Sequence, residues 1–553
     1  MLASKTMHCI HTTTSQSDHL FQIFPPKEER SERLPITQQR QPAGICFLVG
    51  AGPGDPGLLT VRGQELLQQA EVVLYDYLCN RELLRQVPSI AEKIYVGKSA
   101  GKHALTQEEI NALLVKFTKE GKRVVRLKGG DPFLFGRGGE EAEALVDAGL
   151  RFEIVPGVTS AIAGLAYAGI PVTHRKSNSQ LTIFTGHEDP SKDGSSLNYP
   201  LLASTPGTKV MLMGVEQLAS ITTALAVGGM ASTTPVALVR WATTGRHQTI
   251  VGTLGTIAAL AQENDFKAPA IAVFGEVVTL REKLNWFETR PLFGRRIVVT
   301  RTRKQASGLV TALRELGADA YELPTIRIEP LKEKKEIAVF EQAIMEAHHY
   351  DWIIFTSPNG VVAFFDAFYK LRHDARELGN VRLAAIGTGT ARKIEEYRFA
   401  VDLIPPEFVA ESLLKEFQKM SVENLRILLP RAAGAREFLA TELEDRGAIV
   451  DDISAYYTVA ETEDVAGGIQ RFCEEGADMI TFTSGSTVQH FQELAKQRAL
   501  TLPKELVLAS IGPVTSFMMK ELGMTVGLEA EQHDIPGLVE AILGYYTQRP
   551  FIS

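Results

Sequence analysis

The stretch LVGAGPGDPGLLT, residues 48–60, constrains the fold of the first half of the chain most. An apolar strand ending at Val49 runs into a loop rich in glycine and proline, and a helix is expected from about Thr60. The four glycines of the loop can adopt positive φ, and they carry no Cβ, so the backbone can come close to a bound group. Because the ligand crevice of an open parallel sheet lies at the carboxyl ends of its strands, we expect a ligand here.

Residues 52–57 match the pattern G-x-G-x-x-G of a dinucleotide loop, and Asp76 would then take the place of the ribose acid. Pro53 and Pro56, however, have no amide hydrogen to donate to a phosphate. Asp55 adds a carboxylate where a pyrophosphate would be repelled. The loop therefore favours a ligand without phosphate, such as a cationic sulfonium, and a nicotinamide-dependent dehydrogenase stays the alternative.

Length and composition indicate an ordinary globular protein of several domains. The chain has 553 residues, with 44% hydrophobic and 22% charged residues, which predicts about three or four domains. A net charge of -8 argues against general binding of nucleic acid or anionic membranes. The uncharged runs 154–173 and 218–239 contain glycine and proline, so we expect buried α/β segments instead of membrane spans. Residues 1–42 are polar and predict a disordered tail.

The cysteines show no paired spacing, which predicts neither a disulfide framework nor a metal site and fits a reducing cytoplasm; they are Cys9, Cys46, Cys79 and Cys473.

Two further strand ends in the first half carry turns of the same kind. A strand at 123–127 leads to Gly129 and Gly130, and a second strand leads to a turn at 156–157 and a helix capped by Thr159 or Ser160. Beyond this point, four apolar strands are predicted, and QTIVGTL is expected to pair antiparallel with PVALVRW. The second sheet of this half should therefore be mixed.

An internal repeat organises the second half. Three segments recur in the same order, with Ile297 matching Ile427, Phe355 matching Phe482 and Ile386 matching Ile511. Each segment alternates a short apolar strand with an amphipathic helix, which predicts two parallel-sheet α/β lobes. The hydroxyl and glycine turns at the strand ends serve as helix caps, and a cap can still offer its remaining amides to an anion.

Several motifs of the first half resemble the tetrapyrrole methylases, specifically uroporphyrinogen-III C-methyltransferase. They are GAGPGDPGLLT, YDYL, VGK, LKGGDPFLFGRGGEE, VPGVTSA, AGIPVTHR and MLMG, in this order, over about residues 44–285. The resemblance implies two α/β domains, residues 43–157 and 158–287, with S-adenosylmethionine in the cleft between them, and we expect a homodimer through this half. It implies a base at Asp76 and an acid at Lys98. It also implies cofactor contacts at Pro53, Gly129, Gly130, Asp131, Leu134, Thr159, Ser160, Met213 and Ala242.

The residue types suit that chemistry. Methyl transfer to a pyrrole carbon leaves a cationic ring, which a carboxylate such as Asp76 can stabilise or deprotonate. The substrate carries many carboxylates and would need cationic partners; the candidates are Arg126, Lys128, Arg137, His174, Arg175 and Lys176.

The motifs FTSPN, IGTGTA, AYYT, FTSGS and SIGPVTS are similar to uroporphyrinogen-III synthase, over about residues 294–548 of a region spanning 288–553. The resemblance implies closure of hydroxymethylbilane without a cofactor. It also implies interleaved lobes, one formed by 294–325 with 456–548 and the other by 326–455. Tyr456 would assist departure of the hydroxyl group, and the substrate-binding positions would be Ser357, Thr390, Ser484 and Thr515. Candidate partners for the substrate carboxylates are Arg301, Arg303, Arg431 and Arg436.

Together, these resemblances predict a cytoplasmic bifunctional enzyme with small-molecule tetrapyrrole substrates and no metal, nucleic-acid or membrane partner. It would close hydroxymethylbilane to uroporphyrinogen III and methylate it at carbons 2 and 7 to precorrin-2. The sequence leaves siroheme, cobalamin and another tetrapyrrole open as the end product. The alternative is another tetrapyrrole or diphthine-type methylase fused to a two-lobed binding module.

Overall fold

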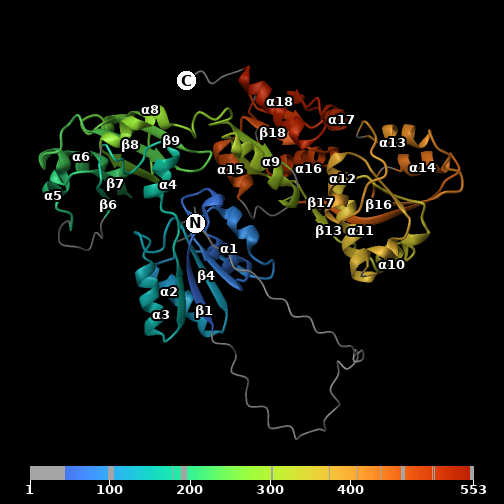
Figure 1. The fold of residues 1–553 in the computed structure, drawn as a ribbon, viewed down its shortest axis with the longest axis horizontal. Coiled ribbons are helices and arrows are strands. Elements are labelled where there is room, and N and C mark those ends of the chain that lie inside the picture. Colours follow the sequence, from blue (N-terminus) through green and yellow to red (C-terminus); the bar gives the residue numbers. More distant parts are fainter. Residues whose placement is uncertain are drawn as a thin grey trace, which may run out of the picture. The chain divides into compact units, whose positions relative to one another are not determined.

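The computed structural model describes residues 44–97, 105–176, 178–187, 196–300, 303–372, 374–407, 409–435, 437–461, 467–500, 502–503 and 505–548. Within these residues, four five-stranded sheets form the framework (Figure 1). The predicted tail, residues 1–42, lies outside the described part of the chain.

The first sheet is parallel throughout and has the order β3-β2-β4-β1-β5. Its strands are β1 (Ile45–Gly50), β2 (Val72–Tyr75), β3 (Glu92–Tyr95), β4 (Arg123–Lys128) and β5 (Arg151–Val155). Helices α2 (Gln107–Lys119) and α3 (Gly138–Asp147) cover one face, and α1 (Val61–Gln68) covers the other (Figure 1). The 3₁₀ helix η2 (Arg81–Gln86) packs on the same face as α1. Because both faces are covered, the central strands are short runs of apolar residues.

Local capping explains where two of these helices begin. The side chain of Thr60 accepts a hydrogen bond from the Gly63 amide and caps α1. Thr106 and Glu109 form a reciprocal capping box at the start of α2. Helix α1 therefore begins where the sequence predicted, directly after Thr60.

The second sheet is mixed, as predicted, and has the order β6-β7-β10-β8-β9. Its strands are β6 (Leu181–Thr185), β7 (Thr208–Leu212), β8 (Pro235–Arg240), β9 (Gln248–Thr253) and β10 (Ala270–Phe274). Only β6 and β7 are parallel to each other, and β8 pairs antiparallel with β9. Helix α4 (Ser160–Tyr167) packs on one face, while α5 (Tyr199–Ser204), α6 (Leu218–Val227) and α7 (Ile257–Glu263) pack on the other.

The two long uncharged runs of the sequence are parts of these α/β layers. Residues 154–173 contain the end of β5 and all of α4, and residues 218–239 contain α6 and most of β8. In the described part of the chain, no helix is both long enough and apolar enough to cross a membrane.

The segment after α8 (Arg281–Leu284) is anchored to the second sheet by Glu288. The Glu288 carboxylate accepts hydrogen bonds from Arg281 and Thr249 and lies 3.0 Å from His247 Nε2. Burial alone would raise the pKa of Glu288, but hydrogen bonds from His247, Arg281 and Thr249 lower it from 4.5 to about 2. The ionised carboxylate therefore stabilises the folded chain.

We expect Glu288→Gln to lower the free energy of unfolding by about 3 kcal/mol at pH 7, since each pKa unit corresponds to about 1.4 kcal/mol. Because the folded-state pKa is the lower one, the contribution of Glu288 is complete above pH 4.5 and disappears as the pH falls toward 2. Urea unfolding of the full chain at pH 7 and at pH 3, followed by tryptophan fluorescence, measures the difference. Glu282→Gln, at an exposed position, is the control. The prediction would be contradicted if the difference in the free energy of unfolding between the native chain and Glu288→Gln were the same at pH 7 and at pH 3.

The third and fourth sheets make up the second half of the chain. The third sheet is parallel, with β12 (Asp319–Glu322), β11 (Arg296–Val299), β18 (Met479–Phe482), β19 (Val507–Ser510) and β20 (Leu528–Glu529) in this order. The fourth has the order β13 (Ile326–Glu329), β17 (Ile449–Ala460), β16 (Arg426–Ala432), β14 (Trp352–Phe355) and β15 (Arg382–Ala385). In the fourth sheet, only the edge strand β13 is antiparallel to its neighbour.

Helices follow most of the strands of this half along the chain. They are α9 (Arg303–Glu315), α10 (Lys334–Met345), α11 (Pro358–Leu371), α12 (Thr388–Glu396), α13 (Ala410–Phe417), α14 (Phe438–Glu444), α15 (Gly468–Glu475), α16 (Gly485–Gln497), α17 (Pro513–Glu521) and α18 (Ile535–Thr547).

The sequence repeat appears as a repeated strand order in these two sheets. Strands β12-β11-β18-β19 of the third sheet correspond to β17-β16-β14-β15 of the fourth, which places Ile297 and Ile427 on matching strands. The third sheet combines the first two strands of this half with its last three. The chain therefore leaves the third sheet after β12, forms the fourth sheet, and returns to the third sheet at β18. Strand β17 pairs first with β16 and then with β13, and it therefore extends past the lobe boundary expected after residue 455. Tyr456 lies in the fourth sheet for this reason.

Candidate functional site

Three backbone turns meet at the carboxyl ends of β1, β4 and β5. The amide of Gly130 donates to the Gly52 oxygen at 2.8 Å, and the amide of Gly52 donates back at 3.3 Å. A Cβ added at Gly50 would lie 2.4 Å from the Gly157 Cα, and one added at Gly157 would lie 2.1 Å from the Gly130 oxygen. Only glycine permits this close approach of three chain segments.

These turns border a pocket that brings together all nine residues predicted to contact the cofactor. The residues are Pro53, Gly129, Gly130, Asp131, Leu134, Thr159, Ser160, Met213 and Ala242. They come from the first domain, from the start of α4 and from turns of the second sheet. A Cβ built on Gly130 would meet no protein atom within 4 Å. The backbone of Gly130 thus faces open space that a ligand can fill.

Of the two predicted acid–base residues, Asp76 and Lys98, the structure describes only Asp76. Asp76 follows β2 directly, its side chain is 27% exposed, and its neighbours Tyr77 and Leu78 line the pocket. Lys98 lies outside the described residues.

Asp131 organises the pocket through its side chain. One carboxylate oxygen accepts the amides of Phe133 and Leu134 at 2.8 and 3.0 Å, and the other accepts the amide of Gly157 at 2.9 Å. The carboxylate therefore ties the turn after β4 to the turn after β5.

Backbone strain is concentrated around this pocket. Four lining residues other than glycine have positive φ: Phe135 (53°), Met213 (56°), Trp241 (45°) and Thr243 (69°). Such conformations are uncommon, especially for the β-branched Thr243, and they cluster at functional sites. Nothing in the sequence indicates them, because none of the four is a residue type that favours positive φ.

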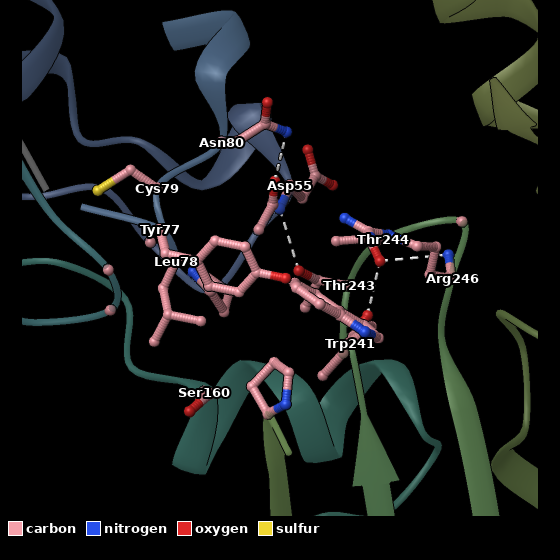
Figure 2. A pocket seen from close by; sticks show the side chains of 18 of the residues that line it. Asp55, Tyr77, Leu78, Cys79, Asn80, Ser160, Trp241, Thr243, Thr244 and Arg246 are labelled. Atoms are coloured by element: carbon pink, nitrogen blue, oxygen red, sulfur yellow. Dashed lines mark hydrogen bonds between the residues drawn. The ribbon is translucent and has the colours of Figure 1, made fainter. Parts of the chain in front are cut away.

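The glycine and proline loop is held by side chains from distant parts of the chain, as Figure 2 shows around Asp55. The Asp55 amide donates to Thr243 Oγ1 at 3.0 Å, and Asn80 Nδ2 donates to the Gly54 oxygen at 2.7 Å. The Tyr167 hydroxyl donates to the Asp55 carboxylate at 2.6 Å. Burial, followed by this contact with Asp55, raises the pKa of Tyr167, so its hydroxyl remains a donor. The sequence reasoning missed Asn80, Tyr167 and Thr243.

The loop departs from a dinucleotide fingerprint in its geometry. Residues Pro56–Leu58 form a separate 3₁₀ turn, η1, and α1 begins only at Val61. Gly57 therefore does not pack a helix start against the strand, and its amide is bound by the Asp55 side chain at 2.7 Å. A pyrophosphate would lose this donor and face the carboxylate.

Exposed apolar side chains surround the pocket. Tyr77 is 55% exposed, Leu78 is 49% and Met213 is 50%, and all three line the pocket. Phe135 is another exposed lining residue. Exposed apolar groups gathered at one pocket are typical of a contact surface for a large apolar ligand.

Two of the predicted carboxylate partners are corrected by the structure. Arg126 and Lys128 are only 3% and 4% exposed, and both bind Glu141 in the interior. Their positions on β4 point them toward α3, so they are not surface cations. Arg137 is exposed and bonded to Glu140; Arg175 and Lys176 are exposed, and His174 is partly buried.

In the fourth sheet, Tyr456 and Ser357 lie together. The Tyr456 hydroxyl is 2.9 Å from Ser357 Oγ, and Ser357 also caps α11 by accepting the Gly360 amide. Burial raises the pKa of Tyr456, while hydrogen bonds with Ser357 and Asn359 lower it in part. The phenol therefore stays protonated at neutral pH and can donate a hydrogen bond.

The other predicted substrate positions follow the repeat. Ser484 caps α16 as Ser357 caps α11. Thr390 and Thr515 are the third residues of α12 and α17, each is 3% exposed, and Thr390 Oγ1 donates to the Ile386 oxygen. The two threonines are thus buried in their helices.

Of the four predicted arginines of this half, only Arg431 has a described side chain. Arg431 is 6% exposed and pairs with Asp452. Arg301, Arg436 and the side chain of Arg303 lie outside the described part of the structure.

Comparisons with known proteins match both halves. Residues 46–258 match the family described as Tetrapyrrole (Corrin/Porphyrin) Methylases, and residues 307–540 match Uroporphyrinogen-III synthase HemD. The porphyrin biosynthesis protein HemD of Ruminiclostridium josui is 39% identical over 90% of this chain and 98% of its own length.

Two methyltransferases are also similar. The uroporphyrinogen-III C-methyltransferase of Bacillus subtilis is 40% identical over 69% of this chain and 77% of its own length. The S-adenosyl-L-methionine-dependent uroporphyrinogen III methyltransferase of Methanosarcina barkeri is 55% identical over 44% of this chain and 94% of its own. The chain therefore belongs to the family in which a tetrapyrrole methylase is joined to a uroporphyrinogen-III synthase.

Proposed function

We propose that this bifunctional enzyme closes hydroxymethylbilane to uroporphyrinogen III and then methylates carbons 2 and 7 to give precorrin-2. The observation that carries the proposal is the pairing of both families in one chain whose predicted cofactor residues all line a single pocket. One half would supply the macrocycle that the other half consumes.

The pocket fits S-adenosylmethionine. No protein atom lies within 4 Å of a Cβ built on Gly130, and Gly50 and Gly157 pack closely nearby without side chains. A ligand can therefore lie directly against the backbone. The Asp55 carboxylate in the lining favours a cationic ligand over a diphosphate. When bound, S-adenosylmethionine supplies an electrophilic methyl group. Pro53, Gly130 and Met213 are among the residues that would hold it.

Asp76 would act beside that pocket. A pyrrole carbon that has gained a methyl group leaves the ring cationic, and a nearby carboxylate can stabilise this charge and accept the departing proton. The exposed apolar residues Tyr77, Leu78 and Met213 would contact the apolar ring carbons of the macrocycle. Of the six cations predicted from the sequence, Arg137, Arg175 and Lys176 are exposed and would bind its carboxylates.

In the synthase half, the Tyr456 hydroxyl would donate a hydrogen bond to the leaving hydroxyl group of hydroxymethylbilane. Its bond with Ser357 fixes the direction of the phenol. Helix starts at Ser357 and Ser484 would offer backbone amides to acetate and propionate groups.

The full chain should be incubated with hydroxymethylbilane and methyl-labelled S-adenosylmethionine, and the tetrapyrrole identified by mass spectrometry and isomer analysis. We expect a type III macrocycle carrying two labelled methyl groups. Spontaneous isomer I alone would contradict the synthase activity, and an unlabelled type III product would contradict the methylase activity. NADH binding without S-adenosylmethionine binding would favour the dehydrogenase alternative.

We expect Tyr456→Phe to slow ring closure about 100-fold or more, because one positioned proton donor contributes roughly 10² to 10⁴ to a rate. The measurement is initial-rate formation of uroporphyrinogen III from hydroxymethylbilane. Tyr369→Phe is the matched control, since its hydroxyl donates to the Tyr397 oxygen elsewhere on the fourth-sheet lobe. An unchanged rate for Tyr456→Phe would remove this hydroxyl from the reaction.

A homodimer through the methylase half and a cytoplasmic location stay predictions. Light scattering of the purified chain tests the first, and fractionation of the native cell tests the second.

A further inference from the structure

A buried cluster of charged side chains lies behind Asp76. Arg126 Nε donates to Glu141 Oε1 at 3.0 Å, and Lys128 Nζ donates to the same oxygen at 2.7 Å. The Glu141 side chain is fully buried, and those of Arg126 and Lys128 are 4% and 5% exposed. The far end of Arg126, Nη2, lies 3.4 Å from Asp76 Oδ2.

The sheet register puts these groups on one face. Leu74 of β2 pairs with Arg126 of β4, and parallel neighbours point to the same side, so Asp76 and Lys128 follow two residues later on that side. Glu141 reaches the same face from α3. The charged residues thus lie on the same face of the first sheet as the apolar residues under α2 and α3, at the carboxyl ends of the strands, where the pocket opens.

The positive and negative charges of the cluster are equal in number only when Asp76 is included. Among the described residues, Arg126 and Lys128 supply two positive charges, while Glu141 supplies one negative charge. The second negative charge is Asp76. A buried ion pair is weak evidence for stability, because removal of charges from water costs several kcal/mol per ion. The cluster is therefore better explained by what it does to Asp76.

A second donor contacts the same carboxylate. The buried Cys79 thiol lies 3.3 Å from Asp76 Oδ1 and 3.2 Å from the Leu127 oxygen, so its single hydrogen is shared between two acceptors. Burial, followed by the charge of Asp76, raises the pKa of Cys79, which keeps the thiol protonated. Arg126 at one oxygen, with the thiol beside the other, limits the rotation of the carboxylate.

We infer that Arg126, held from behind by Glu141, is a positioning residue that orients the Asp76 carboxylate toward the methylation pocket. The inference rests on the proposed role of Asp76 in methyl transfer. Lys128 shares the Glu141 oxygen with Arg126 Nε, and Arg126 Nη2 extends from there to Asp76. Arg126 and Lys128, which precede Gly129 in the motif, therefore act on methyl transfer from the domain interior through Asp76.

A double-mutant cycle tests the inference in the full chain. Arg126→Met, Asp76→Ala and the double variant are compared by single-turnover transfer of labelled methyl from S-adenosylmethionine to uroporphyrinogen III, and by the Kd of S-adenosylhomocysteine. We expect Arg126→Met to slow transfer about 10- to 100-fold, as loss of orientation does. In the Asp76→Ala background, it should change the rate less than about 2-fold, with Kd changed less than about 2-fold in all variants.

Equal effects of Arg126→Met in both backgrounds would overturn the inference, as would loss of S-adenosylhomocysteine binding, since either shows a role independent of Asp76. If Arg126→Met does not fold, Arg126→Lys replaces it, because a lysine head cannot span Glu141 and Asp76 together. The same cycle then applies, with an expected loss of about 3- to 10-fold. Arg123→Met on the same strand is the control and should leave the rate unchanged. A native chain that does not bind S-adenosylhomocysteine would instead contradict the proposed function.

Discussion

Gly130→Val should weaken binding of S-adenosylhomocysteine by about 100-fold or more. The new side chain would occupy open space beside the pocket, where a Cβ meets no protein atom within 4 Å, so the ligand is the group it displaces. A β-branched residue at φ of 69° also carries strain of roughly 1–3 kcal/mol. Isothermal titration calorimetry with S-adenosylhomocysteine measures the loss.

Gly149→Val separates the two causes. Gly149 has a φ of 68° and also has no protein atom within 4 Å of an added Cβ, but it lies in the turn after α3 and does not line the pocket. It should lower the melting temperature about as much as Gly130→Val does while leaving the Kd unchanged. A Kd for Gly130→Val equal to that of the native chain would refute the placement of the ligand against Gly130.

Asp76→Ala should keep the affinity for S-adenosylmethionine and lower methyl transfer by roughly 10² to 10⁴, the range for loss of a positioned acid or base. Affinity should be retained because Asp76 lies beside the pocket lining and is held by Arg126 and Cys79. Rates under saturating donor and substrate, together with calorimetric Kd values, give the measurement.

Asp147→Ala, at the exposed end of α3, is the matched control for loss of a carboxylate. It should retain the native rate and Kd. A native rate for Asp76→Ala would remove this residue from the mechanism, whereas loss of donor binding would show that it contacts the donor directly.

The motifs predicted much of the framework because each is a local device. A glycine turn after an apolar strand and a hydroxyl cap before a helix depend on neighbouring residues only, so the starts of α1 and α2 followed from Thr60 and Thr106. The repeat likewise predicted two lobes, since repeated strands build repeated sheets. The nine residues predicted to contact the cofactor also line one pocket, although their binding roles stay predictions.

Charged residues were harder to place from sequence. Arg126 and Lys128 have the composition of surface cations, yet both are buried because Glu141, on a different element, offers a carboxylate inside the domain. A lysine or arginine is almost never buried without a partner, and the partner is invisible until the chain folds. The place of Tyr456 was also hidden in the sequence. Its strand, β17, pairs first with β16 and then with β13, and these strand partners are known only once the chain has folded.

The sequence by itself determined the α/β class, the mixed second sheet, the two repeated lobes and the family, because each depends on local patterns and motif order. Only the tertiary structure decided how the glycine and proline loop is held and which charges are internal. Asp55 meets Tyr167 across 112 residues and Thr243 across 188, and separations of this size leave no periodic signal in the chain. Contacts between such distant residues form only when the sheets pack, and they give the pocket its shape.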